Sequence, residues 1–448
     1  MFNLPKYIID FLDVFKKNSF EIYVVGGAVR HLLLEKETDN WDFACNAKPD
    51  EILKLFPDAY YNNKYGTVTI PVEIKKERKL LFEVTPYRKE SGYKNYRHPE
   101  KIEWADTIQE DLARRDFTIN AMAYDGHHII DPYNGKHDLE KKLIVAVGDP
   151  DKRFSEDALR LMRGIRQASQ MGFLIEEKTK NSIKKNAELI KNISWERIRD
   201  ELMKIIESDS SSEGILFLKN SGLLKYILPE LDACFAVPQV SPERHHIYDV
   251  GTHSIMSLKY CPSKDQITRL ATLLHDIGKV ETYRKDEKTK IITFYNHEVV
   301  GTKLVQEITN RLRLSNKQKK QLITLVKYHQ FTITELQTDK AVRRFIKQVG
   351  KENIQHMLDL RVGDRIGGGA KPSSWRFELF KKRIIEVQKE PFKISDLKIS
   401  GSDVMKILKL KQGPKIGKIL KQIFEEVIEG KIKNEREILL DKINSFLN

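Results

Sequence analysis

The hydrophobic pattern changes once along the 448-residue chain. Up to about residue 147, short apolar runs such as EIYVVGG, GTVTIPVEI and KLLFEVTPY alternate with helical stretches, which is typical of a domain combining a sheet with helices. From about residue 150 onward, apolar residues recur three and four positions apart, as in WERIRDELMKIIESD, and this spacing predicts helices. We therefore expect an α+β protein with an almost wholly helical remainder.

Two breaks divide the helical remainder. Pro238 and Pro242 bracket one break near 238–243, and the glycine-rich string GGGAKPSS marks another at 367–374. The pattern predicts four parts: a head at 1–147, a helical neck at 148–238, a helical module with most of the histidines at 239–370, and a basic tail at 371–448.

Composition and charge narrow the class of protein. The chain is 40% hydrophobic and 32% charged, which excludes disordered and collagen-like proteins. Lys and Arg number 78 against 64 acidic residues, a net charge of +14 that favours nucleic acid as a partner. The tail alone holds 18 Lys and Arg against 11 acidic residues. It is expected to lie along phosphates, or alternatively to be a solvated lysine-rich surface.

The cysteines and the apolar runs indicate the cellular compartment of the protein. Cys45, Cys234 and Cys261 are odd in number and far apart, so they form neither a disulfide framework nor a thiolate metal cage. No apolar run reaches about 18 residues, and the start of the chain has no export signal. We expect a cytoplasmic protein without a membrane segment.

The head opens with a motif suited to phosphate. An apolar run leads into Gly26-Gly27 and then into a helix that carries Arg30, so backbone N–H groups can approach a phosphate at the helix start. Many sheet-to-helix turns carry such glycines without a ligand. Asn40 and Asp42 follow in a predicted short strand, where residues two apart share a face and would hold Mg²⁺.

At this point the sequence resembles the template-independent nucleotidyltransferases of the polymerase-β superfamily, and among them the bacterial class II CCA-adding tRNA nucleotidyltransferases. The resemblance continues through FEVTPYR at 82–88, QEDLARRDFTINAMAY at 109–124, DPYNGKHDLEKKLIVAVGDP at 131–150 and RFSEDALRLMRGIRQASQMGF at 153–173. It implies a polymerase-β-like head on a mixed sheet. It also implies Mg²⁺ as the metal of the head, CTP and ATP as substrates, and tRNA as the partner.

The resemblance also implies roles for individual residues. Asp42 matches a metal-binding carboxylate, Asn40 stands at the position of its acidic companion, and Glu83 is the candidate for a third acidic group. Asp116 would accept a hydrogen bond from a ribose hydroxyl, and the arginines would bind phosphates. The residues expected to bind the nucleotide are Gly26, Gly27, Arg30, Arg114, Arg115, Asp116, Asn120, Asp157, Arg160 and Arg163.

Asp157 and Arg160 suggest how bases are selected without a template. They are three apart, so on one predicted helix they lie side by side. Cytosine and adenine both present an amino donor beside a ring-nitrogen acceptor, which matches an aspartate acceptor next to an arginine donor. Uracil and guanine present the opposite order. The alternative interpretation is an ordinary ion pair on a helix surface.

Two positions depart from the family pattern. Asn40 replaces the usual aspartate, and His31 replaces the usual aspartate after Arg30, while Asp39 is expected on the other face of the strand. An amide oxygen can bind Mg²⁺ but brings no charge, so metal affinity and transfer rate are expected to be lower.

A second pattern lies between residues 245 and 364, in the strings VGTHSIM, LLHDIGK, YNHEVVG, KYHQF and RVGDRIG. Nitrogen and oxygen ligands of this kind suit Mn²⁺, Ni²⁺, Fe or Zn²⁺. The strings resemble the HD-domain metal-dependent phosphohydrolases, which implies a metal-bound hydroxide that attacks a phosphomonoester or a 2′,3′-cyclic phosphate. Buried histidines that only pack are the alternative. The candidate ligands are His253, His275, Asp276 and Asp364, with His297 and His329 for a second metal.

The leading hypothesis is an enzyme that adds C, C and A to the 3′ end of tRNA, with an accessory hydrolase in the histidine-rich module. One alternative is a hydrolase whose head is weakened by Asn40. A poly(A), A-only or CC-only transferase and an inactive RNA-binding module are further alternatives.

Overall fold

A computed structural model describes the chain apart from residues 1, 3, 62–65, 76–77, 95–97, 241–246, 332–333, 335, 389–393, 429–430 and 448. The chain divides into two compact units. Unit 1 comprises Met1–Pro238 and Gln306–Ser315, and unit 2 comprises Gln239–Val305 and Asn316–Asn448. The first division falls at the break predicted near 238–243, of which 241–243 lie outside the described residues. The finer division into four parts stays a prediction.

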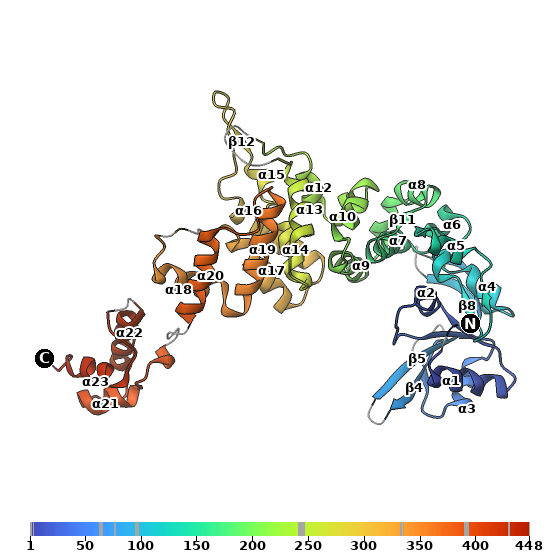
Figure 1. Cartoon of the computed structure of the whole chain (residues 1–448), viewed down its shortest axis with the longest axis horizontal. Coiled ribbons are helices and arrows are strands. Elements are labelled where there is room, and N and C mark those ends of the chain that lie inside the picture. Colours follow the sequence, from blue (N-terminus) through green and yellow to red (C-terminus); the bar gives the residue numbers. More distant parts are fainter. Residues whose placement is uncertain are drawn as a thin grey trace. The chain divides into compact units, whose positions relative to one another are not determined.

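A seven-stranded mixed sheet with the order β3-β4-β5-β2-β1-β8-β9 forms the centre of the head (Figure 1). Strands β2 and β5 are parallel, and the other neighbours are antiparallel. The predicted combination of a mixed sheet with helices is confirmed. The strands are β1 Ile22–Val25, β2 Asp42–Cys45, β3 Tyr60–Tyr61, β4 Val68–Lys75, β5 Arg78–Pro86, β8 Ala123–Tyr124 and β9 Ile129–Ile130.

Helix α1 (Lys6–Lys17) covers one face of this sheet through an apolar stripe. Its buried residues recur at helical spacing, and Phe11 contacts Phe43 of β2 and Phe82 of β5 with ring centroids 4.8 and 4.9 Å apart. This aromatic core fixes the two parallel strands that carry Asp42 and Glu83.

The rest of unit 1 is helical except for two short strand pairs. A hairpin joins β6 (Arg88–Lys94) to β7 (His98–Trp104), and β10 (Leu143–Ile144) pairs with β11 (Leu174–Ile175). The helices are α2 Gly27–Leu33, α3 Pro49–Leu55, α4 Ile108–Ala113, α5 Gly135–Glu140, α6 Pro150–Glu156, α7 Arg160–Met171, α8 Glu177–Lys185, α9 Trp195–Glu207, α10 Ser211–Asn220, α11 Leu224–Ile227 and α12 Pro229–Cys234, with 3-10 turns at Thr118–Asn120 and Ala187–Asn192.

Unit 2 is helical with one small hairpin between β12 (Arg284–Lys285) and β13 (Ile292–Thr293). The prediction of an almost wholly helical remainder is therefore confirmed apart from β11, β12 and β13. No described helix is long and apolar enough to cross a membrane. The helices are α13 Val250–Tyr260, α14 Gln266–Leu274, α15 Lys279–Thr282, α16 His297–Arg311, α17 Asn316–Tyr328, α18 Asp339–Val349, α19 Ile354–Gly367, α20 Trp375–Gln388, α21 Gly401–Leu408, α22 Pro414–Ile428 and α23 Arg436–Asn444, with 3-10 turns at Lys351–Asn353 and Ile394–Asp396.

Glycines let helices of unit 2 approach closely around the histidines. A Cβ added to Gly367 of α19 would lie 2.5 Å from the backbone nitrogen of Ser257 in α13. A Cβ added to Gly278 would lie 2.1 Å from the carbonyl oxygen of His297 at the start of α16. Both distances are far below van der Waals contact, so only glycine permits these approaches.

We predict that Gly367→Ala destabilises unit 2 by about 1–3 kcal/mol, because the methyl group forces α19 away from α13. Calorimetry of the full chain measures this as a lowered unfolding transition. Gly417→Ala is the matched control, because Gly417 is an exposed glycine of α22 whose added Cβ meets nothing within 4 Å. It should be neutral or stabilising by about 0.5–1 kcal/mol. An unchanged transition for Gly367→Ala would contradict the close approach.

Candidate functional site

Unit 1 contains a polar cavity of about 650 Å³, which we call the arginine cavity. Twelve of the thirteen residues predicted to bind the nucleotide or its metal line it, and Glu83 is the exception. Guanidinium groups form bidentate hydrogen bonds with phosphate oxygens, so a cavity rich in them suits a triphosphate. Its arginines are Arg30, Arg88, Arg114, Arg115, Arg160, Arg163, Arg166 and Arg197.

The glycine pair forms the predicted turn between β1 and α2. Gly26 has a φ of +66°, and a Cβ there would meet Nη1 of Arg115 at 3.0 Å. Helix α2 begins at Gly27 and carries Arg30 into the cavity, where its guanidinium donates to Oδ1 of Asn120. His31 follows Arg30, and burial and the neighbouring Arg30 charge lower the pKa of its imidazole.

The expected strand at Asn40 and Asp42 needs correction. Strand β2 begins only at Asp42, and Asn40 lies in the preceding loop, where its backbone N–H and carbonyl both hydrogen-bond the Thr38 hydroxyl at 3.2 Å. Asn40 and Asp42 nevertheless line the same cavity, whereas Asp39 does not. The loop conformation, rather than strand alternation, brings the two side chains together.

Asp42 and Glu83 are direct neighbours in register on the parallel strands β2 and β5. Burial and the nearby Glu83 carboxylate raise the pKa of Asp42, and the Arg115 charge opposes them. A divalent cation would stabilise the ionised form of such a carboxylate. Glu83 itself is exposed and outside the cavity lining, so its role as a third acidic group stays a prediction.

A buried carboxylate that the sequence analysis missed holds two of the arginines. Asp111 of α4 is fully buried and pairs with Nη2 of Arg114 at 2.7 Å and with Nη2 of Arg115 at 3.2 Å. Burial alone would raise the pKa of Asp111, but the two arginines outweigh it and lower that pKa. Glu90 of the β6–β7 hairpin also contacts Arg114, at 3.1 Å. The spacing of three and four residues in QEDLARRD was the signal for this network.

Asp116 is part of a second buried network in the cavity. Its carboxylate forms an ion pair with Arg163 at 2.7 Å, and the amide of Asn120 donates to Asp116 at 3.3 Å and to Gln167 at 3.0 Å. Burial alone would raise the pKa of Asp116, but Arg163 and Arg160 outweigh it and lower that pKa. Asp116 is therefore a charged acceptor at the position predicted for a ribose hydroxyl.

The predicted side-by-side placement of Asp157 and Arg160 on one helix is wrong. Helix α6 ends at Glu156, Asp157 caps it, and α7 begins at Arg160. Asp157 pairs with Arg197 of α9 at 2.8 Å, and Arg160 pairs with Glu156 at 2.7 Å. Both side chains still line the arginine cavity, so they remain candidates for reading a base, each held by a different partner.

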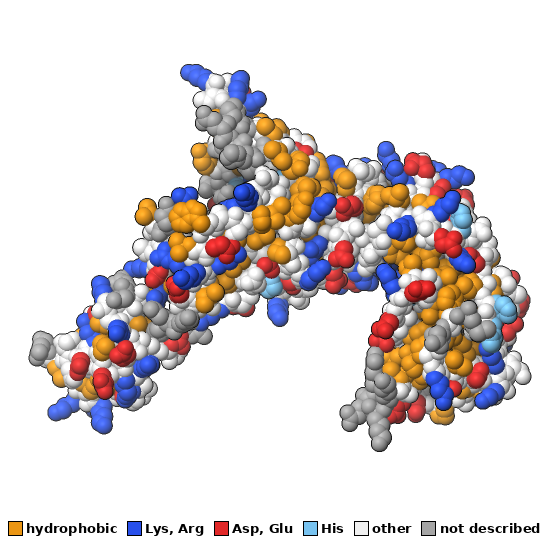
Figure 2. Space-filling model, viewed as in Figure 1, with side chains coloured by type: hydrophobic (Ala, Val, Ile, Leu, Met, Phe, Trp, Pro, Cys, Tyr) orange, Lys and Arg blue, Asp and Glu red, His pale blue; other side chains and the backbone are white. Residues whose placement is uncertain are grey.

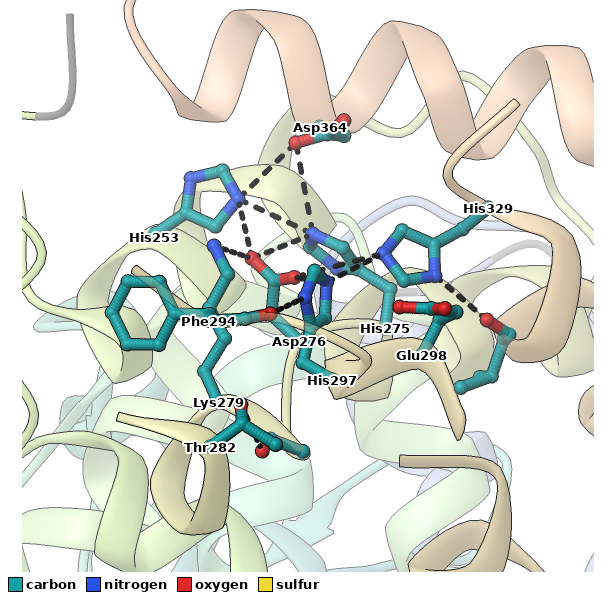
Figure 3. A network of polar contacts seen from close by, with 12 residues as sticks. His253, His275, Asp276, Lys279, Thr282, Phe294, His297, Glu298, His329 and Asp364 are labelled. Carbon is teal, nitrogen blue, oxygen red and sulfur yellow. Dashed lines mark hydrogen bonds and ion pairs between the residues drawn. The ribbon is translucent and has the colours of Figure 1, made fainter. Parts of the chain in front are cut away.

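Unit 2 brings six predicted ligands together, which we call the histidine cluster (Figure 3). The ligand atoms form two groups, and within each group they lie within 4.8 Å of one another. Their helices converge through the glycine contacts described above. The first group is His253, His275 and Asp364, and the second is Asp276, His297 and His329.

Backbone carbonyls orient three of the imidazoles. Nδ1 of His275, His297 and His329 lies 2.7–2.9 Å from the carbonyl oxygens of Thr272, Phe294 and Val326. A carbonyl only accepts, so each Nδ1 carries the proton and each Nε2 is left to bind a metal. Nε2 of His297 and Nε2 of His329 face each other at 3.2 Å, an arrangement that a cation between them would stabilise.

Asp276 connects the two groups of ligands. Its Oδ2 lies 3.2 Å from Nε2 of His275, and its Oδ1 lies 3.1 Å from Nε2 of His297. One carboxylate therefore offers one oxygen to each group, as a ligand that bridges two metals does. Burial alone would lower the pKa of His275, but Asp276 and Asp364 raise it to about 10, and the pKa of Asp276 itself is lowered. The cluster thus combines carboxylate oxygens with imidazole Nε2 atoms, a set of ligands that fits divalent cations.

Three models of known protein families match successive segments of the chain. A model of the poly A polymerase head domain matches residues 22–145, one described as an RNA and SrmB binding site of polymerase A matches 172–235, and one of tRNA nucleotidyltransferase domain 2 matches 282–443. The head is therefore that of a nucleotidyltransferase, and nucleotidyltransferases of this family use divalent metal ions.

Relatives that match along the whole chain specify the family. A CCA-adding enzyme of a Geobacillus species is 30% identical over 95% of this chain and 93% of its own length. One of Lactococcus lactis is 31% identical over 97% of this chain and 95% of its own. The chain belongs to the family of CCA-adding enzymes, which are nucleotidyltransferases, and the predicted family is confirmed.

Solved structures share the fold. The Bacillus stearothermophilus CCA-adding enzyme in complex with CTP has a TM-score of 0.70 at 24% identity and covers 99% of this chain and 98% of its own. The Thermotoga maritima CCA-adding enzyme complexed with tRNA has a TM-score of 0.64 at 19% identity, over 99% of this chain and 97% of its own.

We predict that Asp111→Asn destabilises unit 1 by about 3–5 kcal/mol, because it removes the fully buried negative charge that Arg114 and Arg115 share. Calorimetry measures the loss, and the apparent nucleotide affinity should fall with it. The adjacent change Glu110→Gln is the matched control, because the Glu110 pair with Lys89 is exposed to solvent and contributes little. Equal effects of the two changes would contradict the role of Asp111.

Proposed function

We propose that the protein adds C, C and A to the 3′ end of tRNA from CTP and ATP without a nucleic-acid template. The observation that carries this proposal is the arginine cavity, which unites a glycine turn, Asp42, eight arginines and the Asp157 and Arg160 side chains. Family membership supports it, as do the fold relatives that were solved with CTP, ATP or tRNA.

The chain's own residues perform the binding and selection. The arginines bind the triphosphate, Asp116 accepts from the ribose, and Asp42 with the amide oxygen of Asn40 holds Mg²⁺. When bound, Mg²⁺ would supply positive charge that offsets that of the triphosphate. Asp157 accepts from the amino group of cytosine or adenine, and Arg160 donates to the adjacent ring nitrogen. Arg197 and Glu156 hold these two side chains in place.

The remaining parts hold the tRNA in this proposal. The match to an RNA-binding model at 172–235 supports this role for the neck at 148–238, and the excess of basic residues supports it for the tail at 371–448. Cys45, Cys234 and Cys261 are all buried and form no disulfide with one another, which fits the proposed cytoplasmic location.

The decisive experiment incubates the full chain with Mg²⁺, tRNA that lacks CCA, and labelled CTP or ATP. Ordered addition of two C and one A is the expected result. Addition of C alone, of A alone or of a long A tract would identify the corresponding specialist. No addition by the protein, while a tRNA-binding signal persists, would support an inactive or weakened head.

We predict that Asn40→Asp raises the transfer rate, because a second carboxylate beside Asp42 strengthens Mg²⁺ binding. Single-turnover rates at subsaturating Mg²⁺ measure the gain. The matched control is Asp39→Asn, whose side chain does not line the cavity and whose loss should leave the rate unchanged. A lower or equal rate for Asn40→Asp would mean that Asn40 is not a metal ligand.

We also predict that Asp157→Ala or Arg160→Ala weakens discrimination of CTP and ATP against UTP and GTP, at a cost of about 1–3 kcal/mol per unpaired partner. Ratios of kcat/KM for the four nucleotides measure it. Lys185→Ala is the control, because this exposed lysine of α8 pairs with Asp151 outside the cavity. Unchanged ratios in both cavity variants would leave Asp157 and Arg160 as structural residues.

A second function is favoured by the histidine cluster. We propose that unit 2 binds two transition metals, Mn²⁺, Ni²⁺, Fe or Zn²⁺, and hydrolyses phosphoesters at RNA ends. The bridging position of Asp276 between two groups of ligands supports this proposal, and so do the buried, carbonyl-oriented imidazoles. The metals would supply a nucleophilic hydroxide. His253, His275, His297, His329, Asp276 and Asp364 would hold them.

We predict that the two functions separate. Replacing both His275 and Asp276 by alanine should remove metal from unit 2 and abolish hydrolysis, while CCA addition survives because Asp42 lies in unit 1. Asp42→Ala should do the reverse. Elemental analysis, both activities and circular dichroism are measured on each variant. Loss of both activities from a folded His275/Asp276 variant would refute separate centres, and retained metal would make the cluster structural.

A further inference from the structure

A cavity of about 400 Å³ opens beside the histidine cluster. His297, a ligand of the second group, forms part of its wall, so a phosphate held at the cluster would border this space. Part of the lining is polar and suited to hydrogen bonds with a base, because Asn296 and Gln330 contribute amides and Glu298 a carboxylate. The cavity is therefore large enough and polar enough for a nucleoside.

Tyr295 lines this cavity and is 77% exposed. Its neighbour Phe294 packs against Tyr283, with ring centroids 6.0 Å apart, and against the ammonium group of Lys279 at 5.2 Å. Tyr295 has no ring contact with any described residue. An aromatic ring left open to solvent beside a phosphate-binding centre is the type of surface on which nucleic-acid bases stack.

Cationic side chains extend from the same place along the β12–β13 hairpin. Arg284, Lys285, Lys288 and Lys290 are exposed, and Lys285 and Lys288 form no ion pair with described residues. The hairpin has two acidic residues, Asp286 and Glu287, and Asp286 accepts hydrogen bonds from backbone N–H groups of the turn. Figure 2 shows blue Lys and Arg side chains at the tip of this hairpin, which Figure 1 labels β12. The hairpin can therefore attract a phosphate backbone.

We propose that this cavity is the subsite for the 3′-terminal nucleoside of an RNA, with the base stacked on Tyr295, its ribose phosphate at the histidine cluster, and the preceding phosphates along the hairpin. The proposal rests on the proposed hydrolytic function of unit 2, whose metals hold the phosphate. In the present proposal the protein recognises not only the phosphate but also the terminal base and the preceding phosphates of the RNA strand. A free nucleotide has the same base and phosphate, so the experiment compares RNA with a mononucleotide.

The test uses a short RNA that ends in 2-aminopurine riboside 3′-phosphate, together with the full chain loaded with Mn²⁺. Stacking quenches 2-aminopurine fluorescence, so the readout does not require hydrolysis. We expect quenching with the natural protein and with Tyr295→Phe, and about tenfold weaker binding with Tyr295→Ala, since a stacked base contributes about 1–3 kcal/mol. Tyr260→Ala, an exposed tyrosine of α13 that does not line the cavity, is the matched control.

The hairpin is tested by Lys285→Gln combined with Lys288→Gln. This variant should weaken binding of the RNA several-fold at low salt and lose that difference at high salt. It should leave 2-aminopurine riboside 3′-phosphate alone unaffected. Equal effects on RNA and on the mononucleotide, or none on either, would overturn the RNA part of the proposal and identify the ligand as a free nucleotide.

The outcomes distinguish this proposal from the hydrolytic one. Quenching that depends on Tyr295, without hydrolysis under any tested metal, would support the subsite and reject the hydrolase. Hydrolysis of an RNA 3′-phosphate with the same KM in natural protein and Tyr295→Ala, and with equal quenching, would support the hydrolase and reject the subsite.

Discussion

A buried charge must have a partner, and both candidate sites are built around this constraint. In unit 1 the positive charges of the cavity arginines favour binding of a triphosphate. Without a bound anion, the same charges repel one another and would destabilise the fold. Asp111 offsets Arg114 and Arg115, Asp116 offsets Arg163, and Glu156 offsets Arg160. Each acidic residue also fixes the direction of its guanidinium, so the counter-charges that permit burial also preorganise the cavity.

The same constraint applies in unit 2, where the charges that need partners are those of carboxylates rather than of arginines. The buried Asp276, the half-buried Asp364 and four buried imidazoles lie within a few ångströms of one another, and among the described residues Lys279 and Arg361 bring fixed positive charge to Asp276 and Asp364. Protons can balance this cluster, which is why the pKa of His275 is raised. Metal ions would balance it better, because the Nε2 atoms already face one another.

Much of this was predictable from sequence, and the exceptions have a common physical cause. The glycine turn, the strand runs and the six cluster ligands depend on local spacing or on recognisable strings. The structure brings the six ligands together, but it groups Asp276 with His297 and His329, whereas the sequence placed it with His253, His275 and Asp364. The errors at Asn40 and Asp157 came from the ends of elements, where a strand began two residues late and a helix stopped before Asp157. Arg197 was missed because its partner lies 40 residues away and no periodicity connects them. The position of Asp276 between the two groups of ligands likewise depends on close contacts between segments, such as that of Gly278 with His297, rather than on spacing.

The pairing pattern in the arginine cavity also explains how a head with Asn40 can bind a metal. Four acidic residues line the cavity, and three are committed to arginines, Glu90 to Arg114, Asp116 to Arg163 and Asp157 to Arg197. Among the described cavity residues, Asp42 is the carboxylate without an arginine ion pair. One carboxylate and one amide balance only half the charge of a divalent cation. The phosphates of the incoming nucleotide must supply the remainder, so metal and nucleotide are expected to bind this cavity together rather than in sequence.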